Sequence, residues 1–199
     1  MSVFNPASSP VIMSGGLIVW ENLFTPAELD AMEQYGDLLS LEKAELSAKN
    51  TGRDSIRVTK VAWVMRNEET EAFYAKVETI VLRLNAQFFR YDLSGVVTFQ
   101  YALYDGAESG RFDWHKDYGK DYGAPDQEPR KLSLSIQLSD SAKYEGCELE
   151  VRAGNLTDVA PKTRGAVIAF PSYVLHRVTP ITSGVRKSLV VWAVGPEFK

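Results

Sequence analysis

The chain contains two histidines, His115 and His176, and the first is followed two residues later by Asp117. Residues i and i+2 of a β-strand project to the same side. His115 and Asp117 could therefore offer an imidazole and a carboxylate to one metal ion, and a strand returning beside the first could supply His176. Two imidazoles and one carboxylate on one face leave three coordination positions open, the arrangement found in non-haem iron(II) sites. The ligand set alone does not exclude a zinc hydrolase.

A candidate carboxylate site follows ten residues after His176, at Arg186. Arg186 and Ser188 share one face of a β-branched strand, where an arginine is costly to bury without a partner. A guanidinium binds a carboxylate bidentately, and a hydroxyl two residues away can add a hydrogen bond. The pair could hold the far carboxylate of a dicarboxylate cosubstrate. The alternative is an exposed arginine on an edge strand. Without this second motif, a surface histidine beside a solvated aspartate would explain the His-x-Asp triplet better.

The composition is typical of one globular domain. The 199 residues are 45% apolar and 24% charged, with a net charge of −4. No long run of Lys or Arg occurs, so nucleic acid is not expected as a partner. The single cysteine, Cys147, excludes an intramolecular disulfide and a thiolate metal cage. No stretch resembles a signal peptide or a membrane span, and we predict a cytoplasmic protein that binds no membrane. The oligomeric state stays open.

Two helices are expected before the main group of strands. Thr25 can cap a helix that begins at Pro26, and Glu28 completes a capping box. A second helix is predicted over about residues 67–89, and residues 55–65 indicate a strand. Further strands are predicted at 96–104, 111–117, 131–138, 147–151, 166–170, 173–178 and 186–194. This order predicts a mainly β fold, a barrel or sandwich, with flanking helices.

Two of the predicted strands carry polar residues on their second face. Thr98 and Gln100 alternate with apolar residues in one strand, and Ser133, Ser135 and Gln137 do so in the other. Such faces meet water in many antiparallel sheets. They could equally line a polar interior inside a jelly roll, and alternation alone does not choose between the two.

The order of these motifs resembles the iron(II)/2-oxoglutarate-dependent dioxygenase superfamily, in its prolyl 4-hydroxylase-like branch. It is most similar to the PKHD-type hydroxylases and their bacterial and phage relatives. The motifs that carry the resemblance are Tyr104, segment 110–117 around His115 and Asp117, segment 170–180 around His176, and Arg186-x-Ser188. Residues 144–149 are similar to a Gly-Gly-x-Leu turn, with Cys147 where a second glycine is usual, a departure expected to alter a turn and not the chemistry. The resemblance covers about residues 55–196.

The resemblance implies a double-stranded β-helix, a cupin-like jelly roll. It implies one domain over residues 1–199, with helical support in about 1–92 and the catalytic core in about 93–196. The cofactors implied are Fe(II), with 2-oxoglutarate and O2 as cosubstrates and ascorbate as a candidate reductant. The site residues implied are the metal ligands His115, Asp117 and His176 and the cosubstrate contacts Arg186, Ser188, Tyr104 and Gln137.

The activity that the resemblance implies is that of a 2-oxoglutarate-dependent dioxygenase. It would hydroxylate a C–H bond of a peptidyl prolyl or other amino-acid residue, or of a small metabolite, with release of succinate and CO2. A cupin-like isomerase or hydrolase would explain the metal ligands but not Arg186. A non-catalytic binding module is the third hypothesis. Nucleic-acid demethylases usually have a second arginine where this chain has Trp192. Residues 118–130 suit a lid beside the metal, and Arg57, Trp63 and Trp114 are candidates for the substrate pocket.

Overall fold

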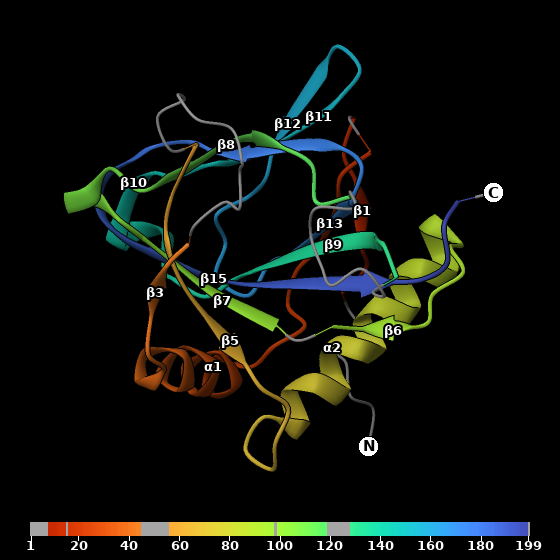
Figure 1. The fold of residues 1–199 in the computed structure, drawn as a ribbon, viewed down its shortest axis with the longest axis horizontal. Coiled ribbons are helices and arrows are strands. Elements are labelled where there is room, and N and C mark those ends of the chain that lie inside the picture. The colour runs from red at the N-terminus through yellow and green to blue at the C-terminus, as the bar shows by residue number, and fades with distance from the viewer. Residues whose placement is uncertain (1–7, 15, 45–55, 98, 119–127, 199) are drawn as a thin grey trace.

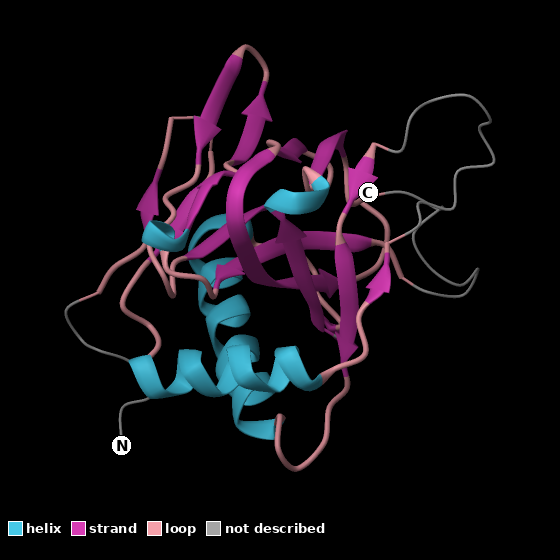
Figure 2. Ribbon diagram, turned by 90° about the vertical axis from the view of Figure 1, so that its left-hand side faces the viewer, coloured by secondary structure: helices cyan, strands magenta, loops and turns pink. Residues whose placement is uncertain are grey.

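The computed structural model describes residues 8–14, 16–44, 56–97, 99–118 and 128–198. Within these ranges two antiparallel sheets face one another, and two helices cover the outer side of the larger sheet (Figure 1). A second view shows both helices on one side of the strands (Figure 2). The predicted jelly roll with flanking helices is therefore confirmed.

The larger sheet is built around one long central strand, β15 (Ile181–Val194). On one side of β15 follow β9 (Arg130–Gln137), β13 (Val167–Pro171), β2 (Ile18–Trp20) and β1 (Val11–Ile12). On its other side follow β7 (Phe99–Asp105), β5 (Lys60–Val64) and β3 (Glu42–Lys43). The short strands β6 (Gly95–Val96) and β10 (Tyr144–Gly146) also pair with β15.

The smaller sheet has the order β12 (Leu156–Val159), β11 (Leu149–Ala153), β14 (Leu175–Val178), β8 (Arg111–His115) and β4 (Arg57–Val58). Two 3₁₀ turns, η2 (Gly106–Glu108) and η3 (Ser141–Lys143), join strands. β14 lies between β11 and β8, so His176 is brought directly opposite His115. This antiparallel pairing places two imidazoles side by side on the face that looks toward the larger sheet.

The helices form against the apolar face of the larger sheet. Helix α1 (Pro26–Leu38) begins with the predicted capping box, in which Glu28 N–H donates to Thr25 Oγ1 at 3.2 Å and Thr25 N–H to Glu28 Oε2 at 2.7 Å. Helix α2 (Glu71–Leu84) continues into a π-helical turn, η1 (Asn85–Phe89). It begins four residues later than predicted because Thr70 and Asn67 hold a hydrogen-bonded turn at its start.

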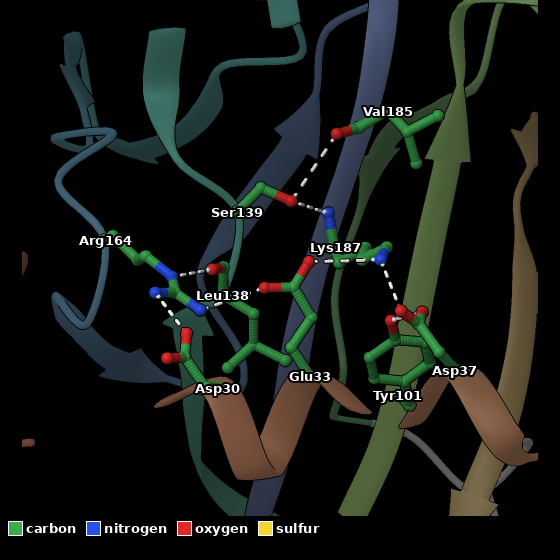
Figure 3. A network of polar contacts seen from close by, with 9 residues as sticks. All are labelled: Asp30, Glu33, Asp37, Tyr101, Leu138, Ser139, Arg164, Val185 and Lys187. Atoms are coloured by element: carbon green, nitrogen blue, oxygen red, sulfur yellow. Dashed lines mark hydrogen bonds and ion pairs between the residues drawn. The ribbon is translucent and has the colours of Figure 1, made fainter. Parts of the chain in front are cut away.

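A network of ion pairs fastens α1 to the strands beside the candidate site (Figure 3). Lys187 Nζ contacts Glu33 at 3.0 Å and Asp37 at 2.7 Å. Arg164 contacts Asp30 and Glu33, and its Nε donates to the carbonyl oxygen of Leu138 at 2.6 Å. Because Lys187 follows Arg186 and Leu138 follows Gln137, the network holds the backbone of both site residues from the opposite face of the sheet.

Several predicted strands differ in detail from the structure. Segment 55–65 is two strands in different sheets, since β4 pairs with β8 and β5 with β7. The strand predicted at 147–151 begins only at Leu149, because Cys147 lies in the turn between β10 and β11. The last strand begins at Ile181, five residues earlier than expected. The division near residue 92 stays a prediction, although β2, β4 and β5 already pair with strands of the core. No described helix has the length and apolarity to span a membrane.

Candidate metal and cosubstrate site

His115, Asp117 and His176 converge at the inner face of the smaller sheet. Each offers one ligand atom, and these atoms lie within 4.8 Å of one another. All three residues are buried. Asp117 lies beyond the end of β8 and not on the predicted strand, so the two-residue periodicity does not position it. Its backbone N–H donates instead to the carbonyl oxygen of Ser172 at 2.9 Å.

Backbone carbonyls orient the two imidazole rings. Nδ1 of His115 lies 2.7 Å from the carbonyl oxygen of Asp113, and Nδ1 of His176 lies 3.0 Å from that of Val174. Each Nδ1–H therefore donates to a carbonyl, and each Nε2 is left as a lone-pair donor that faces Asp117. The Nε2 atoms lie 3.8 Å and 3.4 Å from the carboxylate oxygens. The ring of Phe112 stacks on His115 at 3.4 Å between centroids.

Two side chains of the larger sheet hold the Asp117 carboxylate. Its Oδ2 accepts hydrogen bonds from Ser133 Oγ at 2.7 Å and from Trp192 Nε1 at 2.8 Å. Ser133 Oγ is also 2.8 Å from Ser172 Oγ. Oδ1 faces Nε2 of His115, whereas Oδ2 also lies nearest to Nε2 of His176. Neither donor is predicted as a site residue from the sequence, although Ser133 lies on one of the polar strand faces and Trp192 on the strand face of Arg186.

The electrostatics of His115 and Asp117 match the states that a metal ligand needs, whereas His176 is coupled to the Asp117 carboxylate. Burial, and then the nearby charge of His176, lower the pKa of His115 to about 3. Burial acts to raise the pKa of Asp117, but His176, His115 and the Ser133 hydroxyl outweigh it and hold that pKa below its usual range. Burial opposes protonation of His176, yet the Asp117 carboxylate raises its pKa. At neutral pH His115 is thus neutral and Asp117 ionised.

A continuous polar face runs from the triad along the interior of the larger sheet. On β15 it carries Arg186, Ser188 and Trp192, and on β9 the register places Gln137 opposite Ser188 and Ser133 opposite Trp192. The further members are Gln100 and Tyr104 on β7 and Ser135 on β9. All of these residues are buried, so the polar faces line the interior and do not meet water. The side chain of Thr98 lies outside the described residues.

Arg186 is the charged end of this interior face. It is 1% exposed, its Nε donates to Gln137 Oε1 at 3.1 Å, and its Cζ lies 5.4 Å from the centre of the Tyr104 ring. Among the described residues no carboxylate pairs with it, and the groups that act on its charge are Cys147, Tyr104 and Tyr144. The alternative of an exposed arginine on an edge strand is wrong, because β15 is central. A buried guanidinium without a counterion is a site for an anion.

The other candidates from the sequence are divided by the structure. Trp63 is 48% exposed, and its ring lies 6.2 Å from that of Trp192 at the metal end of the interior face. Arg57 Nη2 donates to Gln100 Oε1 at 2.9 Å, and its Cζ lies 4.5 Å from the Phe112 ring centre. Trp114 instead lies on the outer face of the smaller sheet, where its ring centre is 4.1 Å from Cζ of Arg152 and 4.8 Å from Cζ of Arg177. Most of the predicted lid, residues 119–127, lies outside the described residues.

Comparison with known proteins agrees with this geometry. Residues 99–194 match the family model described as the 2OG-Fe(II) oxygenase superfamily. Segments of the chain are 41% identical over 61 residues to a PKHD-type hydroxylase of Hyphomonas neptunium and 31% identical over 88 residues to one of Alteromonas mediterranea. These matches cover 31% and 43% of this chain and 27% and 39% of the relatives. The chain thus spans about a third of the length of the curated relatives that it matches.

Solved structures share the fold at low sequence identity. A prolyl-4-hydroxylase of Pseudomonas putida superposes with a TM-score of 0.67 at 20% identity, covering 92% of this chain and 95% of that one. A Trichoplax adhaerens prolyl hydroxylase in complex with a hypoxia inducible factor peptide gives a TM-score of 0.70 at 17% identity, covering 91% and 84%. Residues 99–194, which match the 2OG-Fe(II) oxygenase superfamily model, carry the triad and the Arg186 strand.

Proposed function

We propose that this protein is an Fe(II)- and 2-oxoglutarate-dependent dioxygenase that hydroxylates a C–H bond of its substrate and releases succinate and CO2. The observation that carries the proposal is Arg186, a buried cation without a carboxylate partner among the described residues, on the same interior face as a His–Asp–His triad. A metal-dependent isomerase or hydrolase would need the triad and leave this arginine without a purpose. A non-catalytic module would need neither the triad nor the buried arginine.

The donor set fits Fe(II). Two imidazole nitrogens and one carboxylate on one side would leave three positions for other ligands, and His115, Asp117 and His176 would hold the ion. The far carboxylate of 2-oxoglutarate would meet Arg186 and Ser188, within reach of the Tyr104 ring. Gln137 already accepts a hydrogen bond from Arg186, so its role would be to orient the guanidinium.

The difficult chemistry, activation of O2 and oxidative decarboxylation of 2-oxoglutarate, is supplied by the bound iron. The protein's own residues orient the reactants and keep water out. Ser133 and Trp192 fix the Asp117 carboxylate, and Asp113 and Val174 fix the imidazoles through their carbonyl oxygens. The guanidinium of Arg186 sets the depth at which a dicarboxylate can lie. No side chain is required as a general base.

The primary substrate would enter beside Trp63, the exposed aromatic residue at the metal end. The curated relatives are PKHD-type hydroxylases, and one structural neighbour was solved with a peptide bound. These likenesses support an amino-acid residue of a peptide as the substrate, with prolyl hydroxylation as the first reaction to try. Action in the cytoplasm is part of the proposal.

Anaerobic reconstitution tests the proposal. Fe(II) followed by 2-oxoglutarate should give a metal-to-ligand charge-transfer band, and oxygen should then give slow succinate formation without primary substrate. His176→Ala should abolish both. Arg177→Ala is the matched control, because that neighbouring side chain points to the opposite face of β14 and pairs with Glu150 at 2.7 Å. A folded wild-type protein without band or succinate, or an active His176→Ala variant, would refute the proposal.

A further inference from the structure

Tyr144 places a buried hydroxyl beside Arg186, and no described residue accepts a hydrogen bond from it. The residue is 4% exposed, and its hydroxyl has no hydrogen-bond partner of good geometry among the described residues. The side chain is close enough to Arg186 for the two to interact electrostatically. Burying a hydroxyl without a hydrogen bond is unfavourable. The position of Tyr144, on β10 next to β15, therefore indicates that a ligand at Arg186 completes its hydrogen bonding.

Cys147 also lies close to this guanidinium, in the buried cluster that contains Tyr104 and Tyr144. The residue is 1% exposed, and its thiol interacts with Arg186. Its backbone has a φ of +58°, the left-handed region that favours glycine. Glycine is also the residue that the resembled Gly-Gly-x-Leu turn would place here. A cysteine in this conformation is strained, and such strain points to a role for the side chain.

Neither group neutralises the arginine. Burial raises the pKa of the Cys147 thiol and that of the Tyr144 phenol, so both are protonated at neutral pH. The positive charge of Arg186 is thus left for an anionic ligand, while Tyr144 presents an O–H donor and Cys147 a compact, weakly polar surface.

We propose that Tyr144 and Cys147 complete the cosubstrate site around Arg186. The Tyr144 hydroxyl donates a hydrogen bond to the distal carboxylate, and the Cys147 side chain closes the site behind that carboxylate and limits the length of the 2-oxo diacid. The inference rests on the proposed function, since it takes the ligand of Arg186 to be the distal carboxylate of 2-oxoglutarate. It assigns selectivity for the diacid to the turn between β10 and β11.

Removal of the hydroxyl tests the first half. Tyr144→Phe keeps the ring and deletes the donor. The dissociation constant of 2-oxoglutarate, measured without oxygen on the Fe(II) protein through the charge-transfer band, should rise about tenfold, as for the loss of a hydrogen bond to a charged group. The affinity for Fe(II) should not change. Tyr35→Phe, which deletes a hydroxyl on α1 that bonds Asn67, is the control. An unchanged dissociation constant for Tyr144→Phe refutes its role.

Removal of the thiol tests the second half. Cys147→Gly relieves the backbone strain and opens space behind the carboxylate. Binding of 2-oxoadipate, one methylene longer, should gain about tenfold relative to 2-oxoglutarate. Cys147→Ser, of similar size, should keep the wild-type preference. A Cys147→Gly protein that is folded by thermal melting and discriminates like the wild type refutes the inference. A wild-type protein without the charge-transfer band instead refutes the proposed function, so the two failures are distinguishable.

Discussion

The hydrogen bond from Trp192 to Asp117 offers the sharpest test of how the metal site is built. Trp192→Phe keeps an aromatic ring on β15 and removes the Nε1–H that donates to Asp117 Oδ2 at 2.8 Å. Both residues are buried, so water cannot replace the lost donor. A buried hydrogen bond to a charged group is worth about 1.5–3 kcal/mol. Because Ser133 still donates to the same oxygen, we expect the lower end, a loss of about tenfold in Fe(II) affinity.

The assay is a competition titration of Fe(II), without oxygen, against a chelator of known affinity. Trp63→Phe is the matched control, since that tryptophan is half-exposed and its ring stands 6.2 Å from Trp192. Ser133→Ala should weaken Fe(II) binding by a similar factor, and the double variant by more than either single one. Wild-type affinity in a folded Trp192→Phe protein would show that the Trp192 hydrogen bond is not needed to hold the carboxylate, and would refute its assigned role.

Three further predictions concern Arg186 on the interior face and the contact between the larger sheet and α1. Arg186→Met should abolish 2-oxoglutarate binding and spare Fe(II) binding. It should also raise the melting temperature of the cosubstrate-free protein, because a buried unpaired charge is replaced by an apolar chain of similar length. A lower melting temperature would argue against an unpaired cation. Burial, and then its hydrogen bond to Asp37, raise the pKa of Tyr101, so its contribution to stability is complete below about pH 10 and is lost as the pH rises further. Tyr101→Phe should flatten this alkaline decline in denaturant titrations, and an unaltered slope would contradict the assignment. Gly36→Ala would drive a methyl group into the Tyr101 ring, and we expect a loss of about 1–3 kcal/mol in unfolding free energy, measured by denaturant titration.

The period-two pattern of the strands carried most of the information that the sequence held about the site. Arg186 and Ser188 on one strand, and Ser133 and Gln137 on another, were placed on common faces by alternation alone, and the structure buries those faces together. Alternation could not show whether a polar face meets water or lines the interior. That depends on the second sheet, which comes from segments distant in the sequence.

The contacts that the sequence could not predict depend on register between strands distant in the chain. Trp192 reaches Asp117 only because β15 and β9 pair so that Trp192 lies opposite Ser133. Segment 55–65 behaved as one strand in its pattern, yet the chain changes sheets near Thr59, which puts Arg57 and Trp63 in different sheets. Cys147 has a φ of +58°, and a cysteine in a sequence does not predict this left-handed conformation.

The register of β15 couples the two ends of the proposed site. Arg186 and Trp192 are six residues apart on one face, about 20 Å of strand. Arg186 would anchor the cosubstrate, while Trp192 donates a hydrogen bond to Asp117, a proposed metal ligand. A slip of one residue would turn both side chains toward α1 and bring Lys187 inward. The ion pairs of Lys187 with Glu33 and Asp37 oppose that slip, because they fix the outward face of the same strand (Figure 3). The acidic face of α1 therefore stabilises the register of the strand that carries the proposed site.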